Sequence, residues 1–442
     1  MATAEKVDIC TFLDSRPISR TTWGMLFISF IILMFDGFDT AVMAFLAPPL
    51  REAWGIDNTA LGPVVMSGLV GLAVGALTAG PLADRLGRKV VVVGSIFFFG
   101  VWSLVSAFSG SVMALCFWRF LTGMGLGASM PNTVTLMSEY APKRYRSWMI
   151  TVIYCGFSAG AALCGLVTII LVDHWDWRAV LIAGGVVPIL FACYLWVTLP
   201  ESTRFLVLKP ERRNRLQAVV NKLVPGLADG KTEFYTSEVR VEARNTVGVL
   251  LKPEYRLGTV TLWIAMLSIL FANYLLSTWM PSVAKASGMD MAHWALVGAT
   301  FQIGGVFGNF FVGMVMDRIE HHKVLAGAVV LGGVFAAVLA QLHLTLGSMV
   351  LLVFLIGVTV SCVSTGLFAL AAHTYPTEVR ATGVSWAAGI GRLGSITGSG
   401  SGALILGLNF APSAIFMFAL IPLGISAAAI IVKGIKQPSY SR

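Results

Sequence analysis

The stretch GPLADR at residues 80–85 lies between two long apolar segments, and a related stretch, GMVMDR, occurs at residues 313–318. Both keep the glycine and the Asp-Arg pair, and 233 positions separate them (313 minus 80). A second pair of motifs, PKRYR at 142–146 and PTEVR at 376–380, lies 234 positions apart (376 minus 142). Repeats that keep nearly the same spacing over such a distance indicate two halves with a common origin.

The composition excludes a soluble globular protein. Of the 442 residues, 57% are hydrophobic and only 12% are charged, whereas an average soluble domain has about 25% charged residues. The charges are also unevenly distributed, so that long stretches contain none. These features predict an all-α integral membrane protein, because lipid satisfies no backbone hydrogen bonds and the chain must satisfy them within its own helices.

Twelve apolar segments are each about 20 residues or longer, which is enough for a membrane-spanning helix. Their expected limits are 23–48, 60–82, 90–110, 112–136, 147–172, 178–199, 257–281, 293–316, 323–343, 348–372, 381–408 and 412–433. The polar stretch between the sixth and seventh segments contains several prolines and glycines, which indicates a linker. We expect two six-helix bundles, at residues 23–199 and 257–433, joined by a cytoplasmic linker at 200–256. Cytoplasmic tails are expected at 1–22 and 434–442.

Lysine and arginine predict the orientation of these helices. Cytoplasmic loops of membrane proteins carry an excess of both residues. With the N-terminus in the cytoplasm, 26 of the 31 lie on the inner side, three on the outer side, and two, Arg119 and Arg392, inside helices. Both termini are therefore expected in the cytoplasm. The net charge of +9 follows from this topology and from attraction to anionic lipid, so no nucleic-acid partner is expected.

Several motifs resemble those of the major facilitator superfamily. GPLADRLGRK at 80–89 resembles its loop between helices 2 and 3, and RFLTGMGLG at 119–127 resembles its helix-4 signature. Within the superfamily, DGFD at 36–39 resembles the hallmark of the aromatic acid:proton symporters. MPNTVTLMSEY at 130–140 and YPTEVRATGVSW at 375–386 also resemble these symporters. PESTR at 200–204 resembles the segment that ends the first half in the superfamily as a whole.

The resemblance implies the major facilitator fold, with two pseudo-symmetric six-helix bundles in a bacterial inner membrane. It also implies the import of aromatic carboxylates, such as 4-hydroxybenzoate or benzoate, together with protons. Transporters of this kind rock their two halves about a central site.

Asp36 and Asp39 lie three residues apart, so both are on one face of the first predicted helix. A charged residue at the bilayer centre costs roughly 2.5–3.5 kcal/mol on insertion scales, so this face is expected to line a cavity. Burial and mutual repulsion favour the neutral form of at least one carboxyl group. We interpret the pair as a proton-coupling site; a structural pair bonded to arginine or backbone remains the alternative.

Arg119 and Arg392 are the two arginines expected deep in the membrane. Arg119 is a candidate both for the counter-ion of Asp36 or Asp39 and for the docking point of a substrate carboxylate, because a guanidinium binds carboxylates through two parallel hydrogen bonds. Competition between these partners would couple proton and substrate; a fixed salt bridge is the alternative. By resemblance, Arg380 and Arg392 match the second-half arginines of the family, and we assign Arg392 to the substrate and Arg380 to the gate.

A gating role is expected for residues of the two repeated loops and of their neighbours. Asp84 and its basic neighbours fit the family's loop that locks the halves together, and Glu139 is expected to form a gate salt bridge. The second copy of the loop departs from the pattern, since it ends IEHHK in place of LGRK. The gating candidates are Gly80, Asp84, Arg85, Arg88, Glu139, Arg146, Asp317, Arg318, His322 and Arg380.

An aromatic substrate is expected to contact aromatic walls and a few polar groups on helices 1, 4, 7 and 10. For any single aromatic residue, packing inside the protein or against lipid is the more common role. Besides Arg119 and Arg392, the substrate-binding candidates are Phe38, Asn132, Asn273, Tyr274, Trp279 and Ser364. Tyr154, Ser277 and Gln302 are further polar groups that are able to meet ring hydroxyls.

Other functions remain as alternatives. One is a proton-coupled or facilitative carrier of another organic anion, such as a dicarboxylate; the other is a membrane-bound sensor of aromatic acids, although no output domain is recognisable. No catalytic triad, metal-ligand cluster or nucleotide-binding loop is found, so we expect neither an enzyme nor a bound metal or cofactor beyond the coupling protons. The expected partners are an aromatic carboxylate, protons and the bilayer, and the expected working unit is a monomer.

Overall fold

A computed structural model describes residues 6–8, 18–207, 216–217, 219–221, 233–235, 247–316, 318–341, 346–375, 377–408 and 410–436. Long α-helices account for most of these residues. The first half contains α2 (Arg20–Trp54), α3 (Asn58–Leu86), α4 (Arg88–Ser106), α5 (Val112–Tyr140), α6 (Arg146–His174) and α7 (Trp177–Thr198). The second half contains α11 (Pro253–Ala286), α12 (Met291–Met316), α13 (His321–Gln341), α14 (Leu346–Thr374), α15 (Thr377–Gly407) and α16 (Ala414–Lys436).

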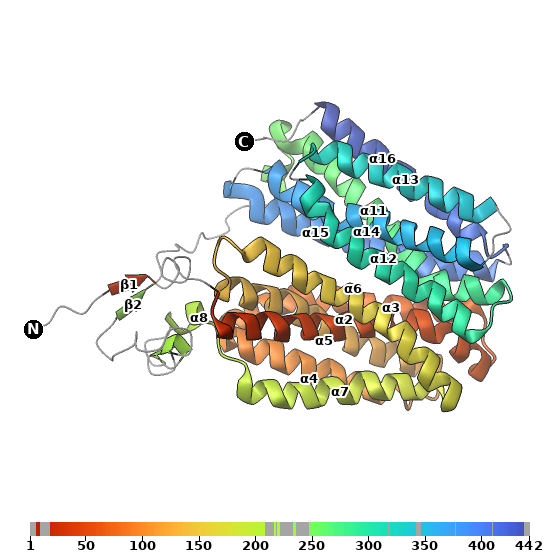
Figure 1. Cartoon of the computed structure of the whole chain (residues 1–442), viewed down its shortest axis with the longest axis horizontal. Helices are drawn as coiled ribbons and strands as arrows, with labels where there is room; N and C mark the ends of the chain where they lie inside the picture. Colours follow the sequence, from red (N-terminus) through yellow and green to blue (C-terminus); the bar gives the residue numbers. More distant parts are fainter. Residues whose placement is uncertain are drawn as a thin grey trace, which may run out of the picture.

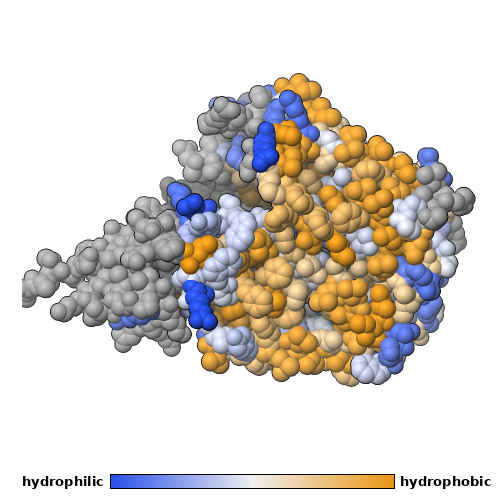
Figure 2. Space-filling model, viewed as in Figure 1, coloured by the Kyte–Doolittle hydropathy of each residue, from blue (hydrophilic) through white to orange (hydrophobic). Residues whose placement is uncertain are grey.

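Each of these long helices overlaps one predicted segment, with ends that differ by a few residues. Eleven of them are long and apolar enough to cross a membrane. The remaining one, α15, is equally long but contains the run GSITGSGSG at 394–402, whose small polar residues lower its hydropathy. Figure 2 shows hydrophobic surface along the helices and hydrophilic residues gathered near their ends. The predicted helical membrane fold is therefore confirmed, and among the described residues only two short strands outside the long helices depart from it.

The long helices form two groups, α2–α7 and α11–α16, which pack mainly within themselves (Figure 1). Glycine allows the closest helix pairs to approach. A Cβ atom at Gly71 of α3 would lie 2.0 Å from the backbone oxygen of Phe120 on α5, and one at Gly123 of α5 would lie 2.0 Å from the backbone oxygen of Gly68. The glycines of the 119–127 motif therefore serve helix packing.

The two halves touch along three helix pairs: α2 with α11, α3 with α15, and α6 with α12. The contacts gather at one end, where Lys285 Nζ of α11 lies 2.6 Å from Glu52 Oε1 of α2. At the same end Gly62 of α3 packs against Ala403 of α15. We call this the closed end. Figure 1 shows the two groups inclined to each other and closest there.

The opposite end, where α2 begins and α7 leads into the central linker, is called the linker end. Its described linker elements are α8 (Thr203–Val207), α10 (Val247–Leu250) and a short strand, β2 (Glu233–Tyr235). Strand β1 (Lys6–Asp8) pairs with β2 in parallel, a contact between tail and linker that the sequence pattern did not predict. The linker end carries the basic loops, so it is the side that the charge distribution predicts to be cytoplasmic.

Candidate functional site

The most extensively bonded charged pair of the described membrane region joins α2 to α5. Arg119 donates from Nη1 to Asp39 Oδ1 at 3.0 Å and from Nη2 to Oδ2 at 2.8 Å, and Nη2 also donates to the backbone oxygen of Asp39 at 3.0 Å. The hydroxyl of Ser103 on α4 donates to Oδ1 at 2.9 Å. Both charged side chains are buried. Of the two aspartates, Asp39 is therefore the partner of Arg119 in this conformation.

Asp36 lies one helical turn from Asp39 and is in a different situation. It is 2% exposed, and neither carboxyl oxygen has a hydrogen-bond partner among the described residues. The hydroxyl of Ser129 on α5 lies nearby without reaching hydrogen-bond geometry. An unpaired carboxylate in such a place is strongly unfavourable, so this conformation suits the neutral, protonated form of Asp36.

Arg392 of α15 is half-buried at the boundary between the two halves. Its guanidinium interacts electrostatically with the hydroxyl groups of Tyr274 on α11 and of Tyr154 on α6. These tyrosines come from opposite halves. No carboxylate forms an ion pair with Arg392 in the described part of the chain, so its cationic group is available to an anion from outside the protein.

A second polar group lies on α11 and α14, where the amide of Asn273 donates to the hydroxyl of Ser364 at 3.1 Å. Asn132 on α5 is instead directed to its own helix, because its amide donates to the backbone oxygen of Ala128 at 2.8 Å. Asn273 and Ser364 are thus brought together, and Asn132 is not joined to them.

A polar seam that sequence analysis missed connects the two halves. Asn309 of α12 donates from its amide to the hydroxyl of Ser158 on α6 at 3.2 Å, and it accepts from the hydroxyl of Thr365 on α14 at 2.7 Å. Ser158 lies four residues after Tyr154, on the same face of α6. The sequence did contain a sign of this contact: Asn309 lies inside an apolar segment, and a polar side chain there needs a hydrogen-bond partner on another helix.

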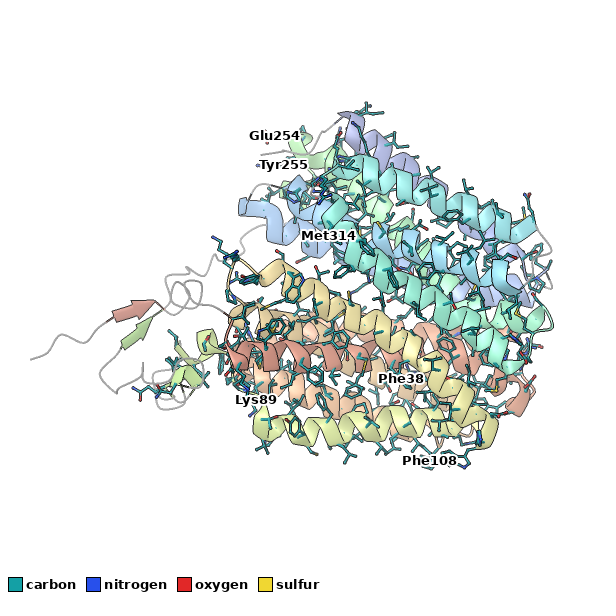
Figure 3. The ribbon with its side chains drawn as sticks, in the orientation of Figure 1. Phe38, Lys89, Phe108, Glu254, Tyr255 and Met314 are labelled. Carbon is teal, nitrogen blue, oxygen red and sulfur yellow. The ribbon has the colours of Figure 1, made fainter. Side chains whose placement is uncertain are left out.

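Two aromatic candidates serve packing in this conformation. The indole of Trp279 is 0% exposed and donates to the backbone oxygen of Ser399 at 2.6 Å, which fixes α11 against α15. Phe38, labelled in Figure 3, is buried in the first half. Its ring lies next to Gly184 of α7. Neither ring offers surface to a ligand here, because periodicity alone does not distinguish a wall residue from a packing residue.

At the linker end of the first half, Glu139 and Glu201 bind the start of α4. Arg88 Nε lies 3.7 Å from Glu139 Oε1, and the backbone N–H of Lys89 donates to Glu201 Oε1 at 2.9 Å. The hydroxyl of Ser202 donates to Glu139. Figure 3 shows Lys89 at this end. The expected salt bridge of Glu139 is therefore present, and its partner is Arg88 of the same half.

The other gating candidates among the described residues also lie at the linker end. Gly80 and Arg85 are exposed at the end of α3, and Arg146 donates to the backbone oxygen of Ala141 at 3.5 Å. Arg318 is exposed and His322 is buried at the start of α13. Asp317 and the side chains of Asp84 and Arg380 lie outside the described residues.

One groove, of about 340 Å³, lies between α6 and α12. Its walls are entirely apolar, and none of the predicted site residues lines it: the lining residues are Val152, Cys155, Val306, Phe307, Phe310 and Phe311. A carboxylate gains no partner there, so the candidate site is the charged and polar set around Arg392, Asp36 and Asp39.

Comparison with known proteins identifies relatives over almost the whole chain. It is 41% identical to the 4-hydroxybenzoate transporter PcaK of Pseudomonas putida over 432 residues, which cover 98% of this chain and 96% of the relative. It is also 41% identical to the gallate transporter of the same organism, over 97% of this chain and 95% of that one. The benzoate transport protein of Acinetobacter baylyi is 26% identical.

The fold is also that of a solved transporter. A structure titled as a partially occluded inward open conformation of the xylose transporter XylE from E. coli superposes with a TM-score of 0.71 at 16% identity, covering 95% of this chain and 98% of that one. The model of the Major Facilitator Superfamily matches residues 28–399 and 262–439. On these matches, the chain belongs to the major facilitator superfamily.

Proposed function

We propose that this protein imports an aromatic carboxylate of the hydroxybenzoate type across a bacterial inner membrane, by symport with protons and by alternating access of its two halves. The observation that carries the proposal is the cation of Arg392, which is half-buried, lacks a carboxylate partner among the described residues and lies between tyrosines of both halves. Relatives 41% identical are transporters of 4-hydroxybenzoate and of gallate.

In this proposal the substrate carboxylate binds the guanidinium of Arg392, and the hydroxyl groups of Tyr154 and Tyr274 donate further hydrogen bonds to it. A guanidinium fits a carboxylate through two parallel hydrogen bonds, and the tyrosine rings supply apolar walls for an aromatic ring. Because Tyr154 and Tyr274 belong to different halves, a substrate held between them links the halves and biases their relative orientation.

The proton site of the proposal is Asp36, with Asp39 and Arg119 as its fixed neighbours. Arg119 neutralises Asp39, so that Asp36 is the carboxyl group free to take up and release a proton. Its lack of a partner among the described residues suits the protonated state of the inward-facing carrier before proton release. The protein is proposed to do this as a monomer, since each half supplies part of the site.

Uptake into proteoliposomes tests the proposal. With an inward-directed proton gradient, labelled 4-hydroxybenzoate is expected to accumulate, and a protonophore is expected to abolish accumulation while leaving exchange across the membrane. Competition by unlabelled benzoate, gallate and succinate ranks the substrates. Undiminished accumulation in the presence of the protonophore would contradict symport, and stronger competition by succinate than by hydroxybenzoates would assign the carrier to dicarboxylates.

A further inference from the structure

The two halves differ at the linker ends of their equivalent helices. Helix α5 and its counterpart α14 begin 234 positions apart, at Val112 and Leu346 (346 minus 112). Helix α4 and its counterpart α13 begin 233 positions apart, at Arg88 and His321 (321 minus 88). In the first half, Glu139 and Glu201 balance the charge at the start of α4.

The second half has lost both of these acids. The position equivalent to Glu139 is His373 (139 plus 234), and its ring lies 4.9 Å from that of His321, which is the counterpart of Arg88. Proline occurs at matching places in α7 and α16, Pro188 and Pro422, again 234 apart. With that spacing the counterpart of Glu201 is Ile435.

The second half has also gained a buried cation. Lys433 of α16 stands where the first half has Leu199 (199 plus 234), and it is only 3% exposed. His322 at the start of α13 is 4% exposed, and neither ring nitrogen has a hydrogen-bond partner in the described residues. The two side chains interact electrostatically, and the His322 ring packs on Gly434.

No carboxylate in the described residues neutralises this cluster. Glu320 is the nearest acid in sequence, but it is exposed and bound to Lys323, with Oε2 at 3.0 Å from Nζ. The ammonium group of Lys433 has the largest electrostatic effect on His322, and the exposed carboxylate of Glu320 offsets only part of it. A buried ammonium group without an acidic partner among the described residues is costly, and a bound anion would stabilise it.

We propose that the linker ends of α13 and α16 form a binding site for the phosphate of an anionic phospholipid, with Lys433 and His322 as donors. The surface beside the cluster favours a lipid over free phosphate. Ile431, Val432 and Ile435 of α16 are 44%, 39% and 76% exposed, so acyl chains find an apolar surface next to the cation. Basic pockets between helices at a membrane surface bind such headgroups.

Native mass spectrometry of the full chain, purified and supplied with phosphatidylglycerol, tests the site. The wild type is expected to retain phosphatidylglycerol in preference to phosphatidylcholine. Lys433→Gln is expected to weaken the retention about fivefold, since one lysine near the surface contributes about a factor of that size. Lys433→Arg keeps the charge and is expected to retain the lipid. Arg256→Gln, which removes an exposed charge of α11, serves as the matched control.

Equal retention by the wild type and by Lys433→Gln would overturn the proposal, as would an equal loss with Arg256→Gln. A parallel titration with inorganic phosphate separates the two sources of the anion. If phosphate at millimolar concentration displaces phosphatidylglycerol and binds in its place, the site is one for free phosphate and the lipid assignment is wrong. His322→Gln, which keeps one nitrogen donor, is expected to weaken retention less than Lys433→Gln.

Discussion

Arg119 binds both carboxylate oxygens of Asp39, at 3.0 and 2.8 Å, and thereby joins α5 to α2 inside the membrane. Asp36, one turn earlier on the same helix, has no such partner among the described residues. The two aspartates of one sequence motif therefore lie in different environments: Asp39 is paired with Arg119, and in the proposed function Asp36 is the carboxyl group that takes up and releases the proton.

Asp36→Asn tests that division of roles. The amide mimics the neutral acid but cannot release a proton, so the carrier is expected to bind substrate and to exchange it without accumulating it against a gradient. The measurement is the ratio of labelled 4-hydroxybenzoate inside and outside proteoliposomes under a proton gradient, with binding followed separately by thermal shift. Ser129→Ala, which alters only the neighbouring hydroxyl, serves as the comparison. Normal concentrative uptake by Asp36→Asn would remove Asp36 from the mechanism.

The ion pair of Asp39 and Arg119 predicts a strong effect on stability. Arg119→Gln leaves a buried carboxylate with one donor, Ser103, and Asp39→Asn leaves a buried guanidinium; removing one partner of a buried pair costs about 3–5 kcal/mol. The double variant is expected to recover much of this free energy, because neither charge remains. Unfolding midpoints in one detergent measure the effect.

Ser103→Ala is the reference variant for that experiment. It removes one hydrogen bond to Asp39, so the free energy of unfolding is expected to fall by only about 1 kcal/mol. Single charge variants as stable as the wild type would show that the pair contributes nothing to folding. A double variant less stable than both single variants would contradict the pairing itself.

The sequence predicted the long helices well but assigned partners poorly, for a physical reason. Apolar length and basic loops are properties of each segment, so the membrane helices could be located one at a time. The partner of Asp39 depends on how α2 and α5 pack; the sequence offered Arg119 as a counter-ion but did not decide between Asp36 and Asp39 as its partner, or between that role and substrate binding. Trp279 illustrates the same limit, because its spacing on α11 does not reveal that α15 covers it.

Closure of the two halves depends on small residues at the closed end. A Cβ atom at Gly62 would lie 2.9 Å from that of Ala403, so Gly62→Leu is expected to force α3 and α15 apart. Overpacking costs about 1–3 kcal/mol, which lowers the closed fraction about 5- to 150-fold. Uptake is expected to fall accordingly, and a buried reporter, Ala299→Cys, is expected to react faster with an impermeant thiol reagent.

Gly424→Leu is the matched control for this substitution. A Cβ atom at Gly424 meets nothing within 4 Å, and the residue lies on the exposed side of α16, so the same change of residue is expected to leave both uptake and reporter reactivity unchanged. Equal reporter reactivity in Gly62→Leu and Gly424→Leu would show that the closed end does not depend on this contact.

Arg392 and its two tyrosines yield the sharpest prediction about substrate binding. Arg392→Lys keeps the charge but loses the planar pair of donors, and such replacements are not conservative at two-point carboxylate sites. With a charged hydrogen bond contributing about 1.5–3 kcal/mol, the KM for 4-hydroxybenzoate is expected to rise roughly 10- to 150-fold. Tyr154→Phe and Tyr274→Phe keep the rings and are each expected to raise KM about fivefold, for the loss of about 1 kcal/mol.

An uncharged competitor, hydroxybenzamide, separates the carboxylate contact from the ring contacts in the same variants. Because hydroxybenzamide has no carboxylate, its weak inhibition of uptake is expected to be the same in Arg392→Lys as in the wild type. An unchanged KM in Arg392→Lys, together with loss of binding in Arg119→Lys, would move the carboxylate site to the first half and make Asp39 its competitor.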